Sequence, residues 1–245
     1  MNDVVPAKRH DALRTPADAE RFLERAGVVL RYAATQGLPI ASLRSAAGSI
    51  DSKAALIRSI ELTNHLLATG IGIEVNVVAD RLTIVHRSLL PALHVLVRRG
   101  RRPDDLEGLS LVARSAYALI RQQREISAGD LRRHLGLKTD PRRDPAYEAL
   151  AELQRALLAA RGPFELPTGG IPYLSTEGYP YHLLHERHPD LVQQSRKLSV
   201  ERAGDRWLTR FLDAAGPVPP RKLASLFRRF LSGDEIREAL NRAGR

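Results

Sequence analysis

Residues 71–86 read IGIEVNVVADRLTIVH. Two runs in this stretch, Ile71 to Val78 and Leu82 to His86, are apolar and rich in β-branched residues, and the short turn Ala79 to Arg81 joins them. Apolar, β-branched runs around a short polar turn are typical of a β-hairpin. The segment therefore predicts an antiparallel hairpin within a chain whose other apolar patterns are mostly helical.

Three helices are predicted ahead of this hairpin. The first begins with Thr15 as N-cap and ends at Gly27, a short second helix covers 38–47, and a long third helix covers 52–67. The segment 28–32 is apolar and partly β-branched, so it is either a strand or a continuation of the first helix. Helix, helix, helix, hairpin is the element order of a winged helix.

One spacing of apolar residues occurs three times along the chain. Offsets of 0, +5 and +9 place three side chains on one face of a short helix and its preceding turn, as the core of a helix-turn-helix requires. The three copies are Leu38, Leu43, Ala47; Ile126, Leu131, Leu135; and Val218, Leu223, Phe227. We therefore expect three related modules: a winged helix over 1–105 with hairpin 71–86, a winged helix over 106–195, and a wingless helix-turn-helix over 196–245. The predicted fold class is mainly α with small β-hairpins (α+β).

The basic charge lies at the two ends of the chain. Lys and Arg number 15 against 11 Asp and Glu in residues 1–105, 11 against 11 in 106–195, and 12 against 6 in 196–245, within a net charge of +10. A basic surface attracts polyanions, and phosphate contact is its usual purpose. The charge and the helix-turn-helix repeat together predict double-stranded DNA as the partner. A solvated, arginine-rich surface is the alternative explanation of the charge.

Composition excludes several other classes. The chain has 245 residues and no cysteine, so disulfides, thiolate metal sites and a thiol nucleophile are absent. Its start, MNDVVPAKRH, lacks the apolar region of a signal peptide, and no run is long enough to span a membrane, so we expect a cytoplasmic protein without membrane contact. Nucleotide-binding glycine loops and the Gly-x-Ser-x-Gly pattern are missing, and the spacing of His182, His185 and His188 suits a metal poorly. We expect no cofactor and no metal.

The candidate DNA contacts are basic residues at turns and at helix ends. Arg81 lies at the tip of the predicted hairpin, where a guanidinium reaches a phosphate or the minor groove. The others precede the third helix of the second module, which is expected over 144–160, or belong to the third module: Arg142, Arg143, Arg221, Lys222, Arg228, Arg229, Arg237 and Arg242. For each of them a solvated charge is the competing interpretation.

Several longer stretches resemble one protein family. They read ISAGDLRRHLGL (126–137), AYEALAELQRALL (146–158), YHLLHERHPDL (181–191) and LSVERAGDRWLTRFLDAAG (198–216), with LERAG (23–27) and HRSLLPAL (86–93) as shorter matches. Together they resemble the AlkZ-type winged-helix DNA glycosylases, most of all the AlkZ-related branch. The resemblance implies tandem winged helices around a DNA-binding cleft and, in the glycosylase branch, metal-free excision of alkylated or crosslinked purines.

The catalytic part of that family pattern is not found. AlkZ-type glycosylases carry a Gln-x-Gln or Gln-x-Asp motif in the first module, whereas here Gln36 is followed by Gly37 and Leu38. No residue is therefore predicted to be catalytic through the resemblance. Three function classes stay open: a DNA-binding protein related to repair glycosylases, an active glycosylase, and a protein-interaction or transcription-regulatory winged-helix protein.

Two further groups of residues bear on catalysis. Glu74 and Asn76 on the first hairpin strand, with His86 on the second, would form a polar cluster in which Glu74 serves as a general base if it faces a substrate. Base flipping would also need aromatic rings for stacking. The candidate rings are Tyr32, Tyr173, Tyr179 and Tyr181.

Overall fold

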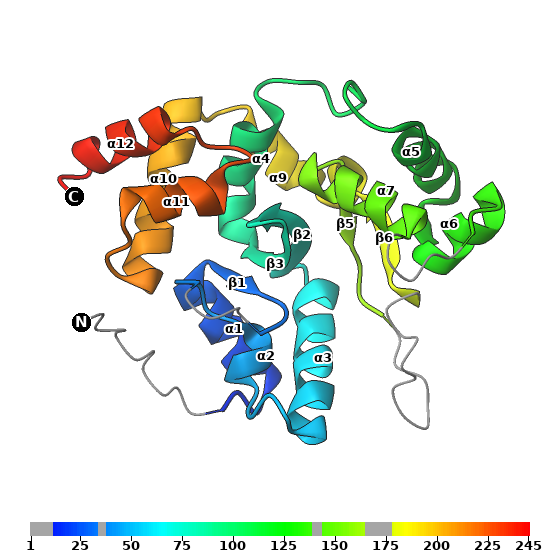
Figure 1. Cartoon of the computed structure of the whole chain (residues 1–245), viewed down its shortest axis with the longest axis horizontal. Helices are drawn as coiled ribbons and strands as arrows, with labels where there is room; N and C mark the ends of the chain where they lie inside the picture. The colour runs from blue at the N-terminus through cyan, green and yellow to red at the C-terminus, as the bar shows by residue number, and fades with distance from the viewer. Residues whose placement is uncertain (1–11, 34–37, 139–143, 165–177) are drawn as a thin grey trace.

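The computed structural model describes residues 12–33, 38–138, 144–164 and 178–245 (Figure 1). Its helices are α1 (Pro16–Ala26), α2 (Leu43–Ala46), α3 (Lys53–Ala68), the 3₁₀ helix η1 (Arg87–Leu89), α4 (Leu90–Arg98), α5 (Leu111–Gln123), α6 (Ala128–Leu135), α7 (Pro145–Arg155), α8 (Leu184–Arg187), α9 (Pro189–Ser195), α10 (Val200–Ala215), α11 (Pro220–Phe227) and α12 (Gly233–Arg242). Its strands are β1 (Val28–Leu30), β2 (Gly72–Val78), β3 (Arg81–His86), β4 (Glu125–Ser127), β5 (Ala159–Arg161) and β6 (Pro180–Leu183). The predicted class, mainly α with small antiparallel strands, is confirmed.

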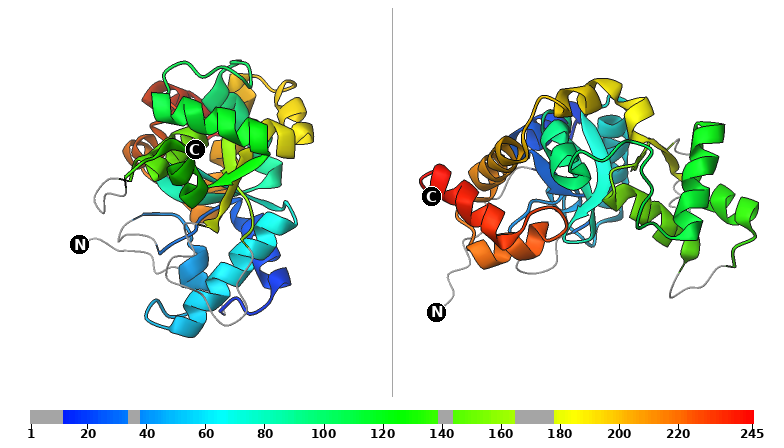
Figure 2. Two further views of the ribbon diagram at one scale, coloured as in Figure 1. Left: turned by 90° about the vertical axis from the view of Figure 1, so that its right-hand side faces the viewer. Right: turned by 90° about the horizontal axis from the view of Figure 1, so that it is seen from above.

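The chain forms three parts that lie side by side. Helices α1–α3 with β1–β3 occupy the middle, α5–α7 with β4–β6 lie on one side, and α10–α12 lie on the other (Figures 1 and 2). Helix α4 follows β3 of the first part and packs against both α9 and α10. Because α10 belongs to the third part, this contact joins the first part to the third.

The first two parts have the same element order. Each runs helix, short strand, helix, helix, strand, strand: α1, β1, α2, α3, β2, β3 and then α5, β4, α6, α7, β5, β6. The strand pairing is also the same, because β1 and β2 both pair with β3, and β4 and β5 both pair with β6. This order is the one that the hairpin and its preceding helices predicted for the first part, and it recurs in the second.

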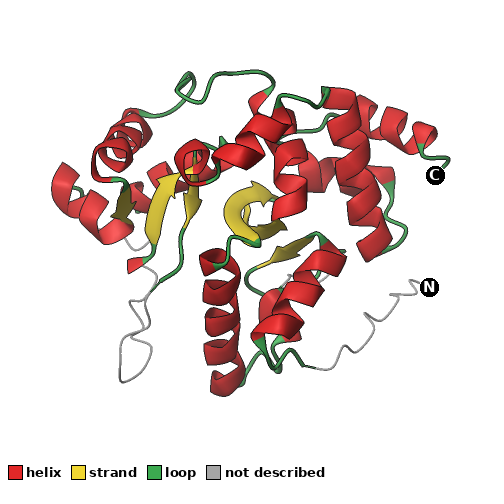
Figure 3. Cartoon of the chain, turned by 180° about the vertical axis from the view of Figure 1, so that it is seen from behind, coloured by secondary structure: helices red, strands yellow, loops and turns green. Residues whose placement is uncertain are grey.

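A single antiparallel sheet joins these two parts, with strand order β1-β3-β2-β5-β6-β4 (Figure 3). From one edge the strands are β1, β3 and β2 of the first part, and from the other edge they are β4, β6 and β5 of the second part. The two halves of the sheet are therefore arranged alike, and β2 and β5 are the strands that meet at the junction. One residue pair makes this junction, Glu74 opposite Arg161. The hairpin β2–β3 is therefore the centre of the molecule, because β2 is paired on both sides.

Local signals explain most helix ends. Thr15 accepts a hydrogen bond from the Asp18 amide while the Asp18 carboxylate accepts from the Thr15 amide, which is the capping box at the start of α1. Ser232 and Glu235 make the same arrangement at α12. Gly27, at φ +72°, ends α1, so the helix predicted from Thr15 to Gly27 is confirmed.

The structure corrects one predicted boundary and settles another. The third helix of the second part was expected over 144–160, but α7 ends at Arg155. Leu157 adopts φ +50°, which ends the helix, and the backbone of 159–161 pairs with β6. The segment 28–32 forms strand β1 at Val28–Leu30, because its backbone hydrogen-bonds along β3.

The repeated apolar spacing correctly predicted buried positions in three short helices. Leu43, Leu131 and Leu223 occupy the short second helices α2, α6 and α11 and are each fully buried. The third part has its own aromatic cluster around Trp207. The Trp207 ring packs edge to face against Phe227 and Phe230, with ring centroids 5.8 and 5.3 Å apart. Residues 196–245, all of them described, form three helices and no strand.

Candidate functional site

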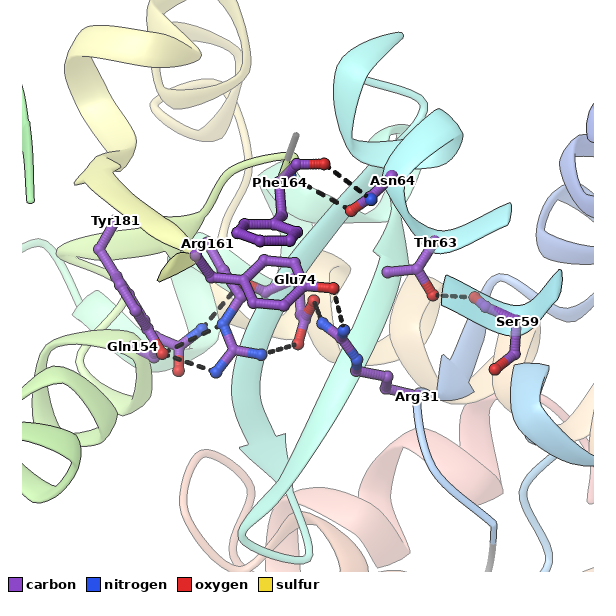
Figure 4. Close-up of polar contacts among 10 residues, drawn as sticks. Arg31, Ser59, Thr63, Asn64, Glu74, Gln154, Arg161, Phe164 and Tyr181 are labelled. Carbon is purple, nitrogen blue, oxygen red and sulfur yellow. Dashed lines mark hydrogen bonds and ion pairs between the residues drawn. The ribbon is translucent and has the colours of Figure 1, made fainter. Parts of the chain in front are cut away.

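A buried cluster of charged residues lies where the first and second parts meet (Figure 4). Glu74 on β2 is completely buried, and each of its carboxylate oxygens has its own arginine. Arg31, just after β1, donates from Nη1 to Oε2 at 2.7 Å, and Arg161, the last residue of β5, donates from Nη1 to Oε1 at 3.1 Å. These three residues, called the junction triad below, come from three separate strand segments.

Two tyrosines complete the junction triad. Arg31 donates from Nη2 to the Tyr179 hydroxyl at 2.5 Å, and Arg161 donates from Nε and Nη2 to the Tyr181 hydroxyl at 3.1 and 2.7 Å. The Arg31 guanidinium also lies 4.5 Å from the centre of the Tyr179 ring, and Arg161 lies 4.9 Å from it. Cations at this distance from a ring face gain a cation–π attraction.

Neighbouring elements hold the junction triad in place. Gln154 on α7 donates to the backbone carbonyl of Glu74 at 3.1 Å. Asn64 on α3 makes two hydrogen bonds to the backbone of Phe164: it accepts one from the amide at 3.2 Å and donates one to the carbonyl at 2.8 Å. The Phe164 ring then packs on Tyr179 with centroids 5.1 Å apart. Long helices of both parts therefore support one polar centre (Figure 4).

The electrostatics favour permanently charged arginines at the junction. Burial opposes the charge of Arg161, but Tyr181 and Glu74 outweigh it and raise the pKa of this guanidinium. Burial likewise raises the pKa of the Tyr181 hydroxyl, which keeps it neutral. Glu74 is fully buried and both of its carboxylate oxygens bond to arginines, so this side chain is not exposed to a substrate. The junction triad is therefore a structural connection.

This arrangement corrects the predicted polar cluster of Glu74, Asn76 and His86. In the register of β2 and β3, Glu74 lies opposite Ile84, while His86 lies opposite Gly72 and bonds to Ser88 instead. Tyr179 and Tyr181 are buried and hydrogen-bonded, so they offer no free stacking face. Tyr32, which is 46% exposed, remains a candidate for stacking, and Tyr173 lies outside the described residues.

The hairpin tip is a second assembly of charged residues. Ala79 and Asp80 have φ of 51° and 56°, so the turn between β2 and β3 has the left-handed conformation of a tight two-residue loop. The Ala79 amide donates to the Leu226 carbonyl of α11 at 2.9 Å. Asp80 forms ion pairs with both Arg228 and Arg229, which lowers its pKa against the effect of burial.

This docking brings predicted DNA contacts from both ends of the chain together. Arg81 follows Asp80 and is exposed, and Arg228 and Arg229 lie at the end of α11. Arg221 is exposed in the first turn of the same two-turn helix, beside the half-buried Lys222. We call Arg81, Arg221, Arg228 and Arg229 the tip surface. Two of its four arginines, Arg228 and Arg229, form ion pairs with Asp80.

The other predicted contacts are placed differently. Arg237 pairs with Asp234 on its own helix. Arg242 is held by Asp205 at 2.7 Å and has Glu201 and Glu238 at 3.5 and 3.9 Å, so it ties α12 to α10. Arg142 and Arg143 lie outside the described residues. Among the predicted residues that the structure describes, several come together only at the tip surface.

Sequence reasoning did not find Arg31 or Arg161. Each follows an apolar run, VVL before Arg31 and LLAA before Arg161, and a charge directly after a buried strand is the one signal that was available. The partnership itself depends on the register of three strands. Among the described residues, no group of three His, Cys, Asp or Glu is placed to hold a metal, and no helix is long and apolar enough to cross a membrane.

Comparison with known proteins supports the fold. No family model and no curated protein sequence matches this chain. Among solved structures, Streptomyces sahachiroi DNA glycosylase AlkZ matches with a TM-score of 0.50 and 13% identity over 97% of this chain. The chain spans 61% of the length of that structure. The protein therefore has an AlkZ-like fold, in agreement with the resemblance in its sequence.

Proposed function

We propose that this protein is a DNA-repair-related protein that binds duplex DNA through the tip surface. The carrying observation is that the hairpin tip docks on the end of α11, which places Arg81 beside Arg228 and Arg229. Clustered and exposed guanidinium groups are suited to contacts with successive phosphates. The likeness to a structure named as a DNA glycosylase supports the same partner. Such a protein would work in the cytoplasm, with access to the chromosome.

The charge balance of the tip surface decides between phosphate contact and a self-contained ion-pair cluster. Arg228 and Arg229 are 61% and 41% exposed although both contact Asp80. Ion pairs at this exposure are weak, about 0–1 kcal/mol. A phosphate with its own negative charge therefore competes for these guanidinium groups at little cost, and Arg81 adds a further donor.

The test is fluorescence anisotropy with a short duplex across a salt series. The variant R81Q/R228Q/R229Q should reduce the slope of log affinity against log salt by about 2.7, from about 0.9 per lost phosphate contact. A control variant, R21Q/R114Q/R187Q, removes three exposed arginines from α1, α5 and α8 and should leave the slope unchanged. Equal slopes for the two variants would remove the tip surface from the interface.

Base excision is the second candidate, and the fold likeness to a DNA glycosylase is the observation that favours it. Incubation with duplexes that carry an alkylated purine, followed by cleavage of abasic sites, measures it directly. Base release by the wild-type chain would establish the activity. Tight duplex binding without base release would leave the DNA-binding function alone.

A protein-interaction role is the remaining alternative. It predicts a continuous exposed apolar patch. The exposed large hydrophobic residues of the described chain come from separate segments: Tyr32, Ile50 and Leu56, and Leu111. Failure to bind any duplex at low salt would favour this role over DNA binding.

A further inference from the structure

A pocket of about 500 Å³ lies away from the junction triad, between the end of α4 and the start of α10. The loop after α4 and the end of α9 form its other walls. Five arginines line it, and no acidic residue does: Arg98, Arg99, Arg101, Arg102 and Arg196. We call it the arginine pocket. None of these residues belongs to the tip surface.

A backbone turn after α4 places residues 98–102 along this pocket. Arg99 and Gly100 both have left-handed φ, 49° and 79°, and the Arg101 amide bonds back to the Arg98 carbonyl at 2.8 Å. This sharp turn stops the chain from running past the helix end. Residues 98–102 therefore line the same hollow as Arg196, which is nearly a hundred positions away in the sequence.

Several of these guanidinium groups lack a carboxylate. Arg99 has one, Glu235 at 2.7 Å, and Arg102 has only a distant contact with Asp104 at 3.6 Å, with both side chains largely exposed. Within the described part of the chain, the side chains of Arg101 and Arg196 make no hydrogen bond or ion pair. The pocket therefore holds more positive charge than its own surroundings neutralise.

Arg98 is the most informative member. It is 3% exposed, and its Nη atoms bond only to backbone carbonyls, those of Ala156, Arg102 and Asp105. Its Nε–H is buried and has no acceptor. Burial lowers the pKa of this guanidinium below its ordinary value. Asp104 and Asp105 lie near enough to favour its charge, but neither carboxylate forms an ion pair with it. A buried cation that no carboxylate contacts is costly, and a bound anion would offset that cost.

The start of α10 adds a second source of positive potential. Ser199 caps this helix of 16 residues and lines the pocket together with Val200. The first amides of a helix lack internal partners, and the helix dipole favours an anion beside them. Glu201, in the same first turn, does not line the pocket and is 3.5 Å from Arg242 instead.

The remaining walls are mostly apolar, and the hydrogen-bonded side chains of His94 and Ser195 are their polar members. Val95, Val192, Leu198 and Val200 line the pocket beside the arginines. Its volume falls within the range of small-molecule sites. An inorganic ion alone would leave this apolar surface uncovered, whereas a ligand with a phosphate and a flat organic group would cover both halves.

We propose that the arginine pocket binds a phosphomonoester on a nucleoside-sized group, with the phosphate at the arginines and the organic group against the valines. A monoester carries up to two negative charges and three terminal oxygens, so it suits several guanidinium groups better than a backbone diester does. Two sources supply this chemistry, a free nucleotide and the phosphorylated 5′ end of a DNA strand. The site is independent of duplex binding through the tip surface.

Calorimetry with AMP and with adenosine tests the pocket. AMP should bind at least about tenfold more tightly than adenosine, since charge-assisted hydrogen bonds supply the difference. R101Q/R196Q should remove that advantage, because both arginines are exposed and make no internal contact whose loss would disturb folding. R202Q is the matched control, since Arg202 is exposed in the first turn of α10 but outside the pocket.

Duplexes with a 5′ phosphate and with a 5′ hydroxyl distinguish the two sources. A preference for the phosphorylated end that disappears in R101Q/R196Q would identify a DNA end as the ligand, whereas AMP binding without that preference would identify a free nucleotide. Melting temperatures equal to wild type confirm that the variants fold. The proposal is overturned if neither AMP nor the phosphorylated end is preferred, or if R101Q/R196Q retains the preference.

Discussion

Replacing Glu74 by Gln tests how far the junction triad holds the first two parts together. The substitution keeps the shape of the side chain but leaves Arg31 and Arg161, which are 5% and 4% exposed, without a carboxylate. Removing one partner from a buried ion pair costs about 3–5 kcal/mol. For a chain of this length each kcal/mol lowers the melting temperature by about 2–4 °C, so we expect a decrease of about 6–20 °C.

Urea denaturation followed by circular dichroism at pH 7 measures this effect, with the midpoint and the slope compared to wild type. Asp190→Asn serves as the control, because its pair with Arg87, at 3.2 Å, is about half exposed and should contribute less than about 1 kcal/mol. The triple variant R31M/E74L/R161M removes all three charges and should recover part of the lost stability, since it also leaves the buried Tyr179 and Tyr181 hydroxyls without these donors. A change below about 1 kcal/mol for Glu74→Gln would refute the view that charge holds this junction.

Three further predictions concern other sites. Asp80→Asn removes the carboxylate that competes with phosphate at the tip surface, so duplex affinity at low salt should rise; anisotropy measures it, and weaker binding would show that Asp80 chiefly orients its arginines. Burial lowers the pKa of His182 to about 3. Below pH 6.5 this imidazole therefore binds a proton in the unfolded chain but stays neutral in the folded chain until the pH approaches 3. The unfolding free energy should therefore be undiminished above pH 6.5 and fall by about 2 kcal/mol from this residue at pH 5, a loss that His182→Phe should abolish in urea titrations. Leu223→Ala should cost about 2–5 kcal/mol in the same assay, because Leu223 is fully buried, whereas Leu111→Ala, at a site 79% exposed, should cost far less.

Local patterns predicted the elements well because their causes are local. A side-chain oxygen that caps a helix and a β-branched run that favours extended backbone act within a few residues of each other. Thr15 is an N-cap as expected, and the hairpin strands lie within one residue of their predicted bounds. The helix expected over 144–160 runs too long for the same reason in reverse. Residues 156–160 are good helix formers, but 156–158 form a turn and the backbone of 159–161 pairs with β6.

By itself the sequence determined the α+β class, the burial of Leu43, Leu131 and Leu223 in three short helices, and the excess of arginine at the two ends of the chain. Tertiary structure alone decided which charges meet: Glu74 with Arg31 and Arg161, Asp80 with Arg228 and Arg229, and five arginines around one pocket. The physical reason is that a helix cap or an apolar period depends on neighbours along the chain, whereas the partner of a charge depends on strand register and on how the parts dock. A shift of one residue in register would turn Glu74 to the opposite face of the sheet and leave both arginines unpaired.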